Sequence, residues 1–280
     1  MLRTVTYLFG RLNIISLEHD KQSIYSTALS TSAPLVRRQT HTWGFSDVEM
    51  VHHDVLGDMY EGFLVKYKDQ ESVEVVNTEA RVIEDEDVQN LIAAHSRFFL
   101  HVQSGIIAYH PIGTVISGNA FVARFAEIIE NAYERFFISA EILPVNEPEA
   151  FKEALRHFTR IDRLSIYLHP SNPSSRDIWQ SIDDKLRAMN ARDYREEYNG
   201  QRSDRGLRPD ADEMIERKIA MVEDGYGHAE ATGIRGGKKR IASTRSLPLS
   251  VDAPSDSAES PDVLKALSDT FRSVLRRFEK

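Results

Sequence analysis

The stretch from Gly233 to Pro248, GIRGGKKRIASTRSLP, combines glycine with positive charge, since it holds three glycines and five Lys or Arg side chains. Glycine lets a loop approach a phosphate closely and the cations neutralise it, so this composition is typical of loops that bind a nucleotide or a nucleic-acid backbone. The spacing excludes the Walker A nucleotide loop, G-x-x-x-x-G-K-[ST]. Thr232 stands where its first glycine belongs, and Lys239 stands where its Ser or Thr belongs.

The paired glycines Gly236 and Gly237 predict a hairpin turn instead. Both central residues of a type I′ turn need positive φ, which glycine adopts without strain. The strand-like runs on either side also exclude a dinucleotide-binding loop, which joins a strand to a helix. We therefore expect an exposed basic hairpin tip that contacts phosphates. Its expected contact residues are Arg235, Lys238, Lys239 and Arg240, with Arg245 just beyond the second strand.

A second basic segment, ARDYREEYNGQRSDRGLRP, covers residues 191–209 and interleaves arginine with tyrosine. Arginine neutralises backbone phosphates, and the flat rings of Tyr194 and Tyr198 are of the kind that stack on bases. The expected contact residues of this segment are Arg192, Arg195, Arg202, Arg205 and Arg208. The alternative is that both basic segments are ordinary solvated surface.

The charge of the chain is unevenly distributed around its formal net value of -8. Residues 1–150 carry 11 Lys and Arg against 21 Asp and Glu, whereas residues 151–280 carry 24 against 22. Such an asymmetry between halves is a composition signal that bears on binding partners. It indicates that the two halves face different partners or face each other, and it favours the second half as the surface for DNA or RNA.

The composition is that of a globular protein. With 280 residues and 41% hydrophobic content, the chain can bury one large core or two modest ones. It has no Cys, which excludes disulfides and thiolate metal sites and fits a reducing cytosol. No stretch approaches the roughly 20 apolar residues of a membrane span, and the N-terminal run lacks the cleavage site of a signal peptide. We expect a cytoplasmic protein with no membrane partner.

The hydrophobic periodicity predicts an α+β fold with an antiparallel or mixed sheet and split β-α-β elements. The N-terminal part is expected to be mainly β and the C-terminal part rich in helix. The expected divisions are a β domain over 1–114, an α+β domain with the basic segments over 115–251, and a linker with a C-terminal amphipathic helix over 252–280. That helix must dock either on its own domain or on a partner subunit.

Some element boundaries follow from local signals. The acidic run Glu84 to Asp87 is expected to open a short helix, VQNLIAAHS, over 88–96, because acidic groups are favoured at a helix N-terminus. Helix starts are also expected at Asn146, at Ser174 with Asp177, and at Asp210 with Glu213. The helix that follows Ser174 is expected to bury a stripe consisting of Ile178, Ile182, Leu186 and Met189.

Catalytic motifs are weak in this sequence, and we assign no catalytic residue, metal ligand or cofactor. Glu216 and Lys218 have the E-x-K spacing of some metal-dependent nucleases, but they lie in a helical pattern, whereas such sites use a strand. There is no G-x-S-x-G elbow, and without Cys there is no thiol nucleophile. Three functions stay open: a nucleic-acid-binding protein, a subunit that docks a partner effector, and a nuclease whose site is assembled by the fold.

From about residue 95 onward, the order of elements resembles the bacterial proteins of the DUF4747 type. The most specific features are the strand that runs into HPSNPSS, residues 169–175, and the HAEATG strand, 228–233, followed by STRSLP, 243–248. In layout the chain is more distantly similar to the phage-exclusion protein Rex A and to the B subunit of the Kiwa anti-phage system. This resemblance implies a bacterial defence protein that binds nucleic acid as a homo-oligomer or with a second defence protein. It implies no catalytic residue.

Overall fold

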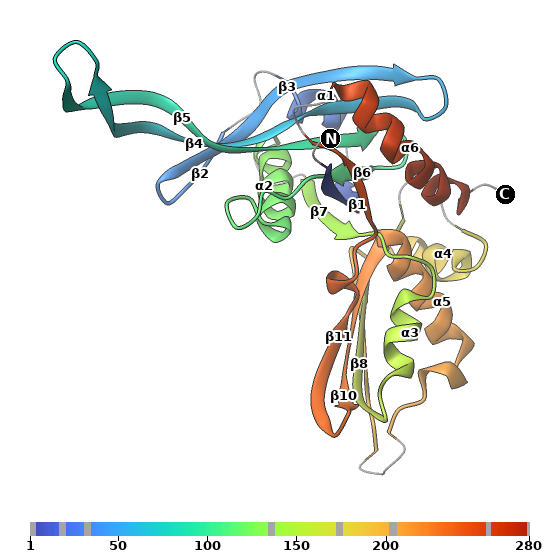
Figure 1. The fold of residues 1–280 in the computed structure, drawn as a ribbon. Coiled ribbons are helices and arrows are strands. Elements are labelled where there is room, and N and C mark those ends of the chain that lie inside the picture. The colour runs from blue at the N-terminus through green and yellow to red at the C-terminus, as the bar shows by residue number, and fades with distance from the viewer. Residues whose placement is uncertain are drawn as a thin grey trace.

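The computed structural model describes residues 4–16, 21–30, 35–133, 138–171, 176–201, 206–255 and 259–278. It confirms the expected α+β class, with two sheets in which every described strand pair is antiparallel. In Figure 1 the first sheet lies at the top of the molecule and the second hangs below it. None of the described helices is both long and apolar enough to cross a lipid bilayer.

The first sheet has eight strands and contains the first and the last of the described strands. Its path is β12 (Ser250–Pro254), β1 (Thr4–Ser16), β6 (Ile106–Tyr109), β5 (Val82–His101), β4 (Gly57–Asn77), β3 (His41–His53) and β2 (Val36–Arg38), and β7 (Ile138–Pro144) also pairs with β1. The sheet therefore takes in β7 and β12, which lie outside the expected 1–114 segment.

Both faces of the first sheet are covered, as the alternation along β1 dictates. Tyr7 and Phe9 point to the face covered by α6 (Ser260–Arg276), where the rings of Phe9 and Phe271 lie 5.1 Å apart. Leu12 and Ile14 point to the other face, which is covered by α1 (Lys21–Ala28) and α2 (Gly118–Asn131). The amphipathic C-terminal helix thus buries its apolar side on its own chain, which was one of the two expected places.

Strands β4 and β5 continue beyond the rest of the sheet as a two-stranded ribbon, residues 68–91, called the arm below (Figure 1). The helix expected over 88–96 is wrong, because these residues belong to β5 and pair with β4. The acidic run lies in the same strand, with Glu84 opposite Val75 and Asp87 opposite Ser72. Pairing with a neighbouring strand satisfies the backbone over the whole segment, and this long-range gain outweighs the weak local signal for a helix.

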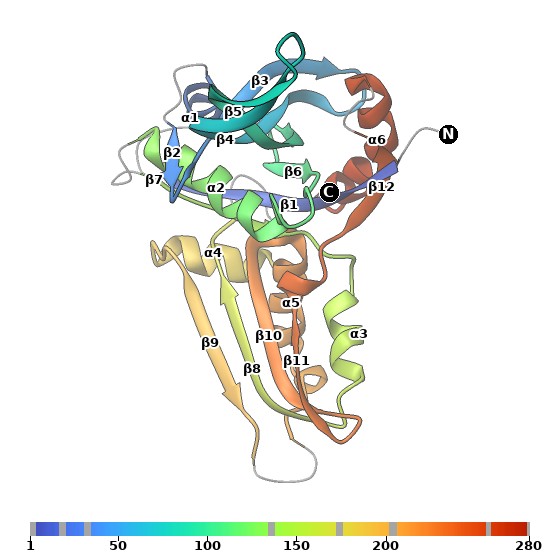
Figure 2. The ribbon, with the colours of Figure 1, turned by 60° about the vertical axis from the view of Figure 1, so that its left-hand side comes forward.

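The second sheet has four strands in the order β11 (Lys238–Ser243), β10 (Gly227–Arg235), β8 (Arg160–Leu168) and β9 (Tyr194–Asn199). β9 and β10 are both antiparallel to β8, so they run parallel on either side of it and form a split β-α-β unit through α5 (Glu213–Met221). The helices α3 (Ala150–Arg156), α4 (Gln180–Ala188) and α5 pack on one face. Figure 2 shows the strands of this sheet from the opposite, open side.

The helix starts differ from those expected. α5 begins after Asp212, two residues later than the expected start at Asp210, and the Asp212 carboxylate accepts a hydrogen bond from the Met214 amide at 2.8 Å. α3 begins after Glu149 rather than Asn146. Asn146 is fully buried and its side chain instead donates to the Thr244 carbonyl at 2.9 Å.

The expected buried stripe of α4 is half wrong. Ile182 and Leu186 are buried as expected, but Ile178 and Met189 are 46% and 54% exposed. Trp179 takes the core position instead, because the helix begins only at Gln180 and the preceding turn directs the indole inward. Ser174 lies outside the described residues.

A buried polar cluster joins the two sheets. It consists of Arg11, Arg176, Trp179, Asp224 and Arg277, called the hub below. The Asp224 carboxylate accepts hydrogen bonds from Arg176 Nη1 at 2.8 Å and Trp179 Nε1 at 2.9 Å, and lies 3.5 Å from Arg277. Arg11 of β1 donates to the Asp224 carbonyl at 2.8 Å. The hub therefore ties β1, α6 and the segment that precedes α4 to the π-helical turn Val222–Tyr226.

Candidate nucleic-acid interface

The open face of the second sheet presents its side chains in rows set by the strand register. Tyr167 of β8 is directly opposite Arg195 of β9 and His228 of β10. Directly opposite residues of an antiparallel pair share a face and lie side by side. The three side chains therefore form one continuous row of cation, aromatic ring and imidazole.

The next row along the strands is acidic. Ser165 is opposite Glu197 on β9 and Glu230 on β10. Arg163 lies on the same face, two residues before Ser165 in β8. Its guanidinium is 4.0 Å from the Glu197 carboxylate and 3.9 Å from the Glu230 carboxylate. Positive and negative rows thus alternate down the sheet. A hollow of about 320 Å³ lies over these rows and is lined by Arg163, Ser165, Ile166, Tyr167, Arg195, His228 and Glu230.

A charged bridge closes the upper end of the open face, where it meets the first sheet. Glu141 of β7 accepts a hydrogen bond from Arg245 Nη2 at 3.0 Å and lies 3.0 Å from Nε2 of His169. Arg245 Nη2 is also 3.3 Å from Nδ1 of His228, and because a guanidinium only donates, this Nδ1 is the acceptor. Glu141 and Arg245 also line a second hollow of about 470 Å³ between α2 and β7.

The protonation states of this site follow from burial and from its neighbours. Burial and the Arg245 guanidinium lower the pKa of His228 to about 4, so the imidazole is neutral at pH 7. Burial acts to raise the pKa of Glu141, but the hydrogen bond from His169 and the nearby Arg245 outweigh it and leave that pKa lowered. Burial, followed by the nearby carboxylates of Asp193 and Glu141, raises the pKa of Tyr167. His228 therefore adds no positive charge to the site at pH 7.

The predicted basic hairpin is confirmed. Arg235 and Lys238 are opposite each other across Gly236 and Gly237, which have φ angles of 57° and 71°. Because neighbouring residues of a strand point to opposite faces, the cations of the hairpin are divided between the two faces of the sheet. Lys239 is opposite Ile234 and shares the open face, whereas Arg240 is opposite Gly233 and belongs to the other face.

The Arg/Tyr segment is also divided by alternation, because its first half forms strand β9. Arg195 lies on the open face, but Tyr194 and Tyr198 pack against the core under the helices. The ring of Tyr194 lies 5.4 Å from the Lys218 ammonium group of α5. The expectation that these two rings share a surface with Arg195 is wrong, and Tyr167 is the ring of the open face.

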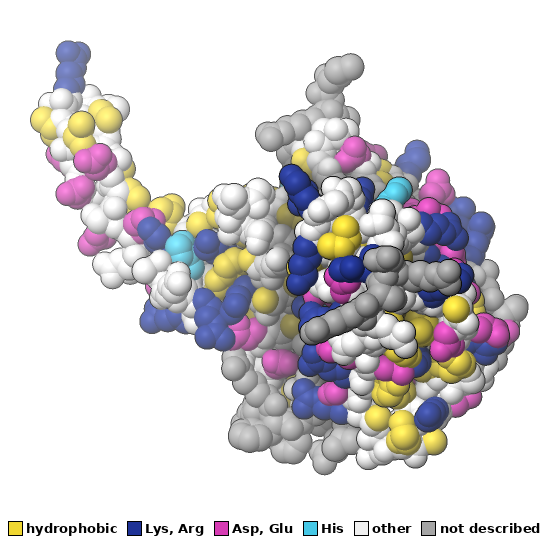
Figure 3. Space-filling model, turned by 90° about the horizontal axis from the view of Figure 1, so that it is seen from below, with side chains coloured by type: hydrophobic (Ala, Val, Ile, Leu, Met, Phe, Trp, Pro, Cys, Tyr) yellow, Lys and Arg dark blue, Asp and Glu magenta, His cyan; other side chains and the backbone are white. Residues whose placement is uncertain are grey.

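Arg192 and Arg208 lie outside the strands of the second sheet. Arg192 precedes β9 and donates weakly to Ser139 of β7 at 3.4 Å, and Arg208 lies 3.8 Å from Asp210 before α5. Arg202 and Arg205 lie outside the described residues. The fold thus brings Arg195, Lys239 and Arg245 to the open face and turns Arg240 to the other face. Seen from below in Figure 3, Lys and Arg side chains are interspersed with Asp and Glu over the lower end of the molecule.

Sequence reasoning missed the residues that β8 and β10 contribute. Arg163, Tyr167 and His228 carry the site, yet no sequence motif marks them. The available signal was the period of two, since Arg163, Ser165 and Tyr167 alternate with buried Leu164 and Ile166. That signal places these residues on one face, but only the pairing of the strands shows that Arg195 lies beside them.

The nuclease motif has a structural explanation. Lys218 of the E-x-K pattern lies in α5 and forms an ion pair with Glu196 of β9. Among the residues that the structure describes, no three His, Asp or Glu side chains gather in a way that could hold a metal ion.

The fold and the site define a class of α+β protein in which one antiparallel sheet is covered on both faces and a second leaves a charged face open. A family model described as a domain of unknown function, DUF4747, matches residues 5–272. The chain therefore belongs to the DUF4747 family, as its layout indicated. None of the curated proteins matches the chain.

Proposed function

We propose that this protein binds DNA or RNA through the open face of its second sheet, chiefly by contacts to the phosphate backbone. The observation that supports this most directly is the row formed by Arg195, Tyr167 and His228, which the strand register places side by side. Tyr167 is partly exposed. Cations beside an accessible ring are the combination that holds single strands, because the cations neutralise phosphates while the ring stacks on a base. Such binding is weakly sequence-specific and sensitive to salt.

The acidic row narrows the proposed path of the strand. Phosphates are repelled by Glu197 and Glu230, so the backbone runs along the row of Arg195 and Tyr167 toward Arg245 rather than down the sheet. The neutral His228 beside Arg245 accommodates a base or sugar at that end without adding repulsion.

We further propose that this protein is cytoplasmic and acts as a sensor or effector of bacterial anti-phage defence. This part of the proposal rests on the similarity of layout to Rex A and to the Kiwa B subunit. The alternative role as a subunit that docks a partner through its C-terminal helix loses support, because α6 buries its apolar side on the first sheet.

A salt titration of binding tests the proposal. Fluorescence anisotropy with single-stranded DNA, single-stranded RNA and duplex DNA of equal length should show an affinity that falls linearly with the logarithm of salt concentration. Arg195→Gln should weaken binding and reduce the slope by about 1. Arg217→Gln, on α5 at the covered side of the sheet, is the matched control. Folded protein that binds none of these at low salt would refute the proposal.

A second test asks whether removing a negative charge from the open face strengthens or weakens the binding of nucleic acid. Glu230→Gln keeps the shape of the side chain, removes its negative charge and frees Arg163, which lies 3.9 Å away. A phosphate ligand should then bind several-fold more tightly, because repulsion is removed and a cation is released. A cationic ligand would bind more weakly. Weaker binding of nucleic acid to this variant would show that the open face is not the phosphate contact.

A further inference from the structure

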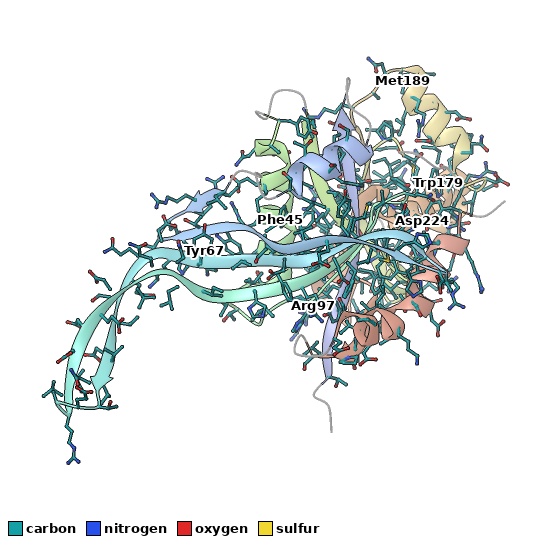
Figure 4. All side chains as sticks on the ribbon, turned by 90° about the horizontal axis from the view of Figure 1, so that it is seen from above. Phe45, Tyr67, Arg97, Trp179, Met189 and Asp224 are labelled. Atoms are coloured by element: carbon teal, nitrogen blue, oxygen red, sulfur yellow. The ribbon has the colours of Figure 1, made fainter. Side chains whose placement is uncertain are left out.

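The arm is the least covered part of the first sheet. β3 ends its pairing with β4 at Thr42, opposite Tyr67, and beyond that point β4 and β5 pair only with each other among the described strands. In Figure 4, where Tyr67 is labelled near the root, the ribbon curves away from the body. An isolated two-stranded hairpin is at best marginally stable in water, and its free edges can pair with another strand.

The two edges of the arm differ in their chemistry. The β5 edge carries four consecutive carboxylates, Glu84 to Asp87, and such a run of charge blocks pairing with another strand. The β4 edge instead carries Val73, Val75 and Val76, and β-branched residues favour strand pairing. Apolar surface near the tip is exposed on both strands, since Val76 is 69% and Ile83 of β5 is 71% exposed, but on β5 it adjoins the run of carboxylates. The β4 edge is therefore the one that is suited to a partner strand.

We propose that the β4 edge of the arm pairs with the same edge of a second copy of this chain, antiparallel and about a two-fold axis. A two-fold axis perpendicular to the strands makes the contact isologous and the two β4 strands antiparallel. The two ribbons then become one four-stranded sheet, which passes the threshold of about three strands for independent stability. With about ten residues in each strand, the shared edge extends for about 33 Å.

The charge distribution along the arm fits this arrangement. Residues 69–90 hold eight Asp or Glu side chains and one Arg, whereas the root carries Arg37, Lys66 and Lys68. Arg37 pairs with Asp69 and Lys68 with Glu71 of the same chain, so the root is locally close to neutral while the outer part is acidic. In an antiparallel pair, the acidic outer part of each arm lies beside the root of the other, which holds these cations. A tip-to-tip arrangement would instead bring like charges together. The dimer should accordingly weaken as the salt concentration rises.

Sedimentation of the full chain tests the edge. The wild type should be dimeric, and Val73→Lys with Val75→Lys should raise the dissociation constant about tenfold or more. The matched control is Val82→Lys with Val88→Lys, which adds the same charges to the same face of the arm but on β5. A wild type that stays monomeric up to about 100 μM, or an equal effect of both pairs, would overturn the proposal.

Cysteine cross-linking provides a readout that does not depend on stability. The chain has no Cys, so a single introduced Cys can form only an intermolecular disulfide, and this requires Cα atoms within about 7 Å. Cys placed in turn at Gln70, Ser72 and Glu74 of β4 should give covalent dimers at one or more positions. Cys at their opposite residues Gln89, Asp87 and Asp85 of β5 should not. Cross-linking from β5 alone, or from neither edge, would contradict the proposed contact.

Discussion

The two sheets of this protein differ in how many of their faces are covered. The first sheet has helices on both faces, and each face is the centre of an apolar cluster. The second has helices on one face only, and its other face carries Arg163, Tyr167 and Arg195 in cross-strand rows. An antiparallel sheet tolerates water on one face, so the exposed residues of the second sheet are not required for its core.

This difference in coverage indicates that the residues that stabilise the fold and the residues proposed to bind a ligand lie in different parts of the molecule. The first sheet holds both described ends of the chain, through β1 and through β12 with α6. The second sheet supplies the open face, which points to the same side of the molecule from which the arm projects (Figures 1 and 2). Substitutions in covered faces should therefore change stability, whereas substitutions on the open face should change binding.

The largest expected effect is in the covered face under α6. Phe271 is fully buried against Phe9, so Phe271→Ala should lower the free energy of unfolding by about 3 to 5 kcal/mol. Chemical denaturation monitored by circular dichroism measures it. A loss below about 1 kcal/mol would mean that α6 is not part of the folded core.

The next effect is in the hub between the sheets. Asp224→Ala leaves buried Trp179 and Arg277 without their carboxylate, which should cost about 3 kcal/mol. Figure 4 labels Trp179 and Asp224 in this region. Asp269→Ala is the control, because Asp269 forms only an exposed pair with Arg272 and should cost less than about 0.5 kcal/mol. If the two variants were equally stable in thermal unfolding, the hub would not be what holds the two sheets together.

A smaller effect should appear as a pH dependence at the edge of the open face. The folded chain lowers the pKa of His228 to about 4 from the usual 6.5, so between these values the unfolded chain binds a proton that the folded chain does not. Stability should therefore fall as the pH drops from 6.5 to 4, by about 1 to 2 kcal/mol after allowance for partial exposure. His228→Asn should remove this part of the profile. If the stability of the wild type and of His228→Asn changed in parallel with pH, the assignment of this pH dependence to His228 would be wrong.

The smallest effect is expected for an apolar side chain on the open face itself. Ile241 of β11 is 65% exposed and lies opposite Thr232. Ile241→Ser should change the free energy of unfolding by no more than about 0.5 kcal/mol, in contrast to Phe271→Ala. Denaturation under the same conditions makes the comparison. A loss of more than about 2 kcal/mol would indicate that this face is covered in solution.

Local signals predicted much of the fold. The positive φ required at Gly236 and Gly237 identified the basic hairpin, and the apolar period of 3.6 residues identified α6. These predictions hold because each depends on interactions within a few residues of one another.

The errors came from competition between local and distant interactions. The segment after Glu84 has a helix-start signal, yet pairing with β4 makes it a strand. Asn146 is a residue type that often caps a helix, yet its side chain is buried and donates a hydrogen bond to the Thr244 carbonyl. In both cases hydrogen bonds to residues far away in the sequence stabilise the observed structure more than the local helix signal would.

The sequence by itself determined the α+β class, the hairpin and the basic character of the second half. Only the tertiary structure decided which of those cations share a surface, because a strand sends neighbouring residues to opposite faces. The pairing of β9 with β8 put Arg195 beside Tyr167 and turned Tyr194 toward the core. The packing of α6 on β1 likewise depended on residues more than 200 positions apart, whose contact no local pattern encodes.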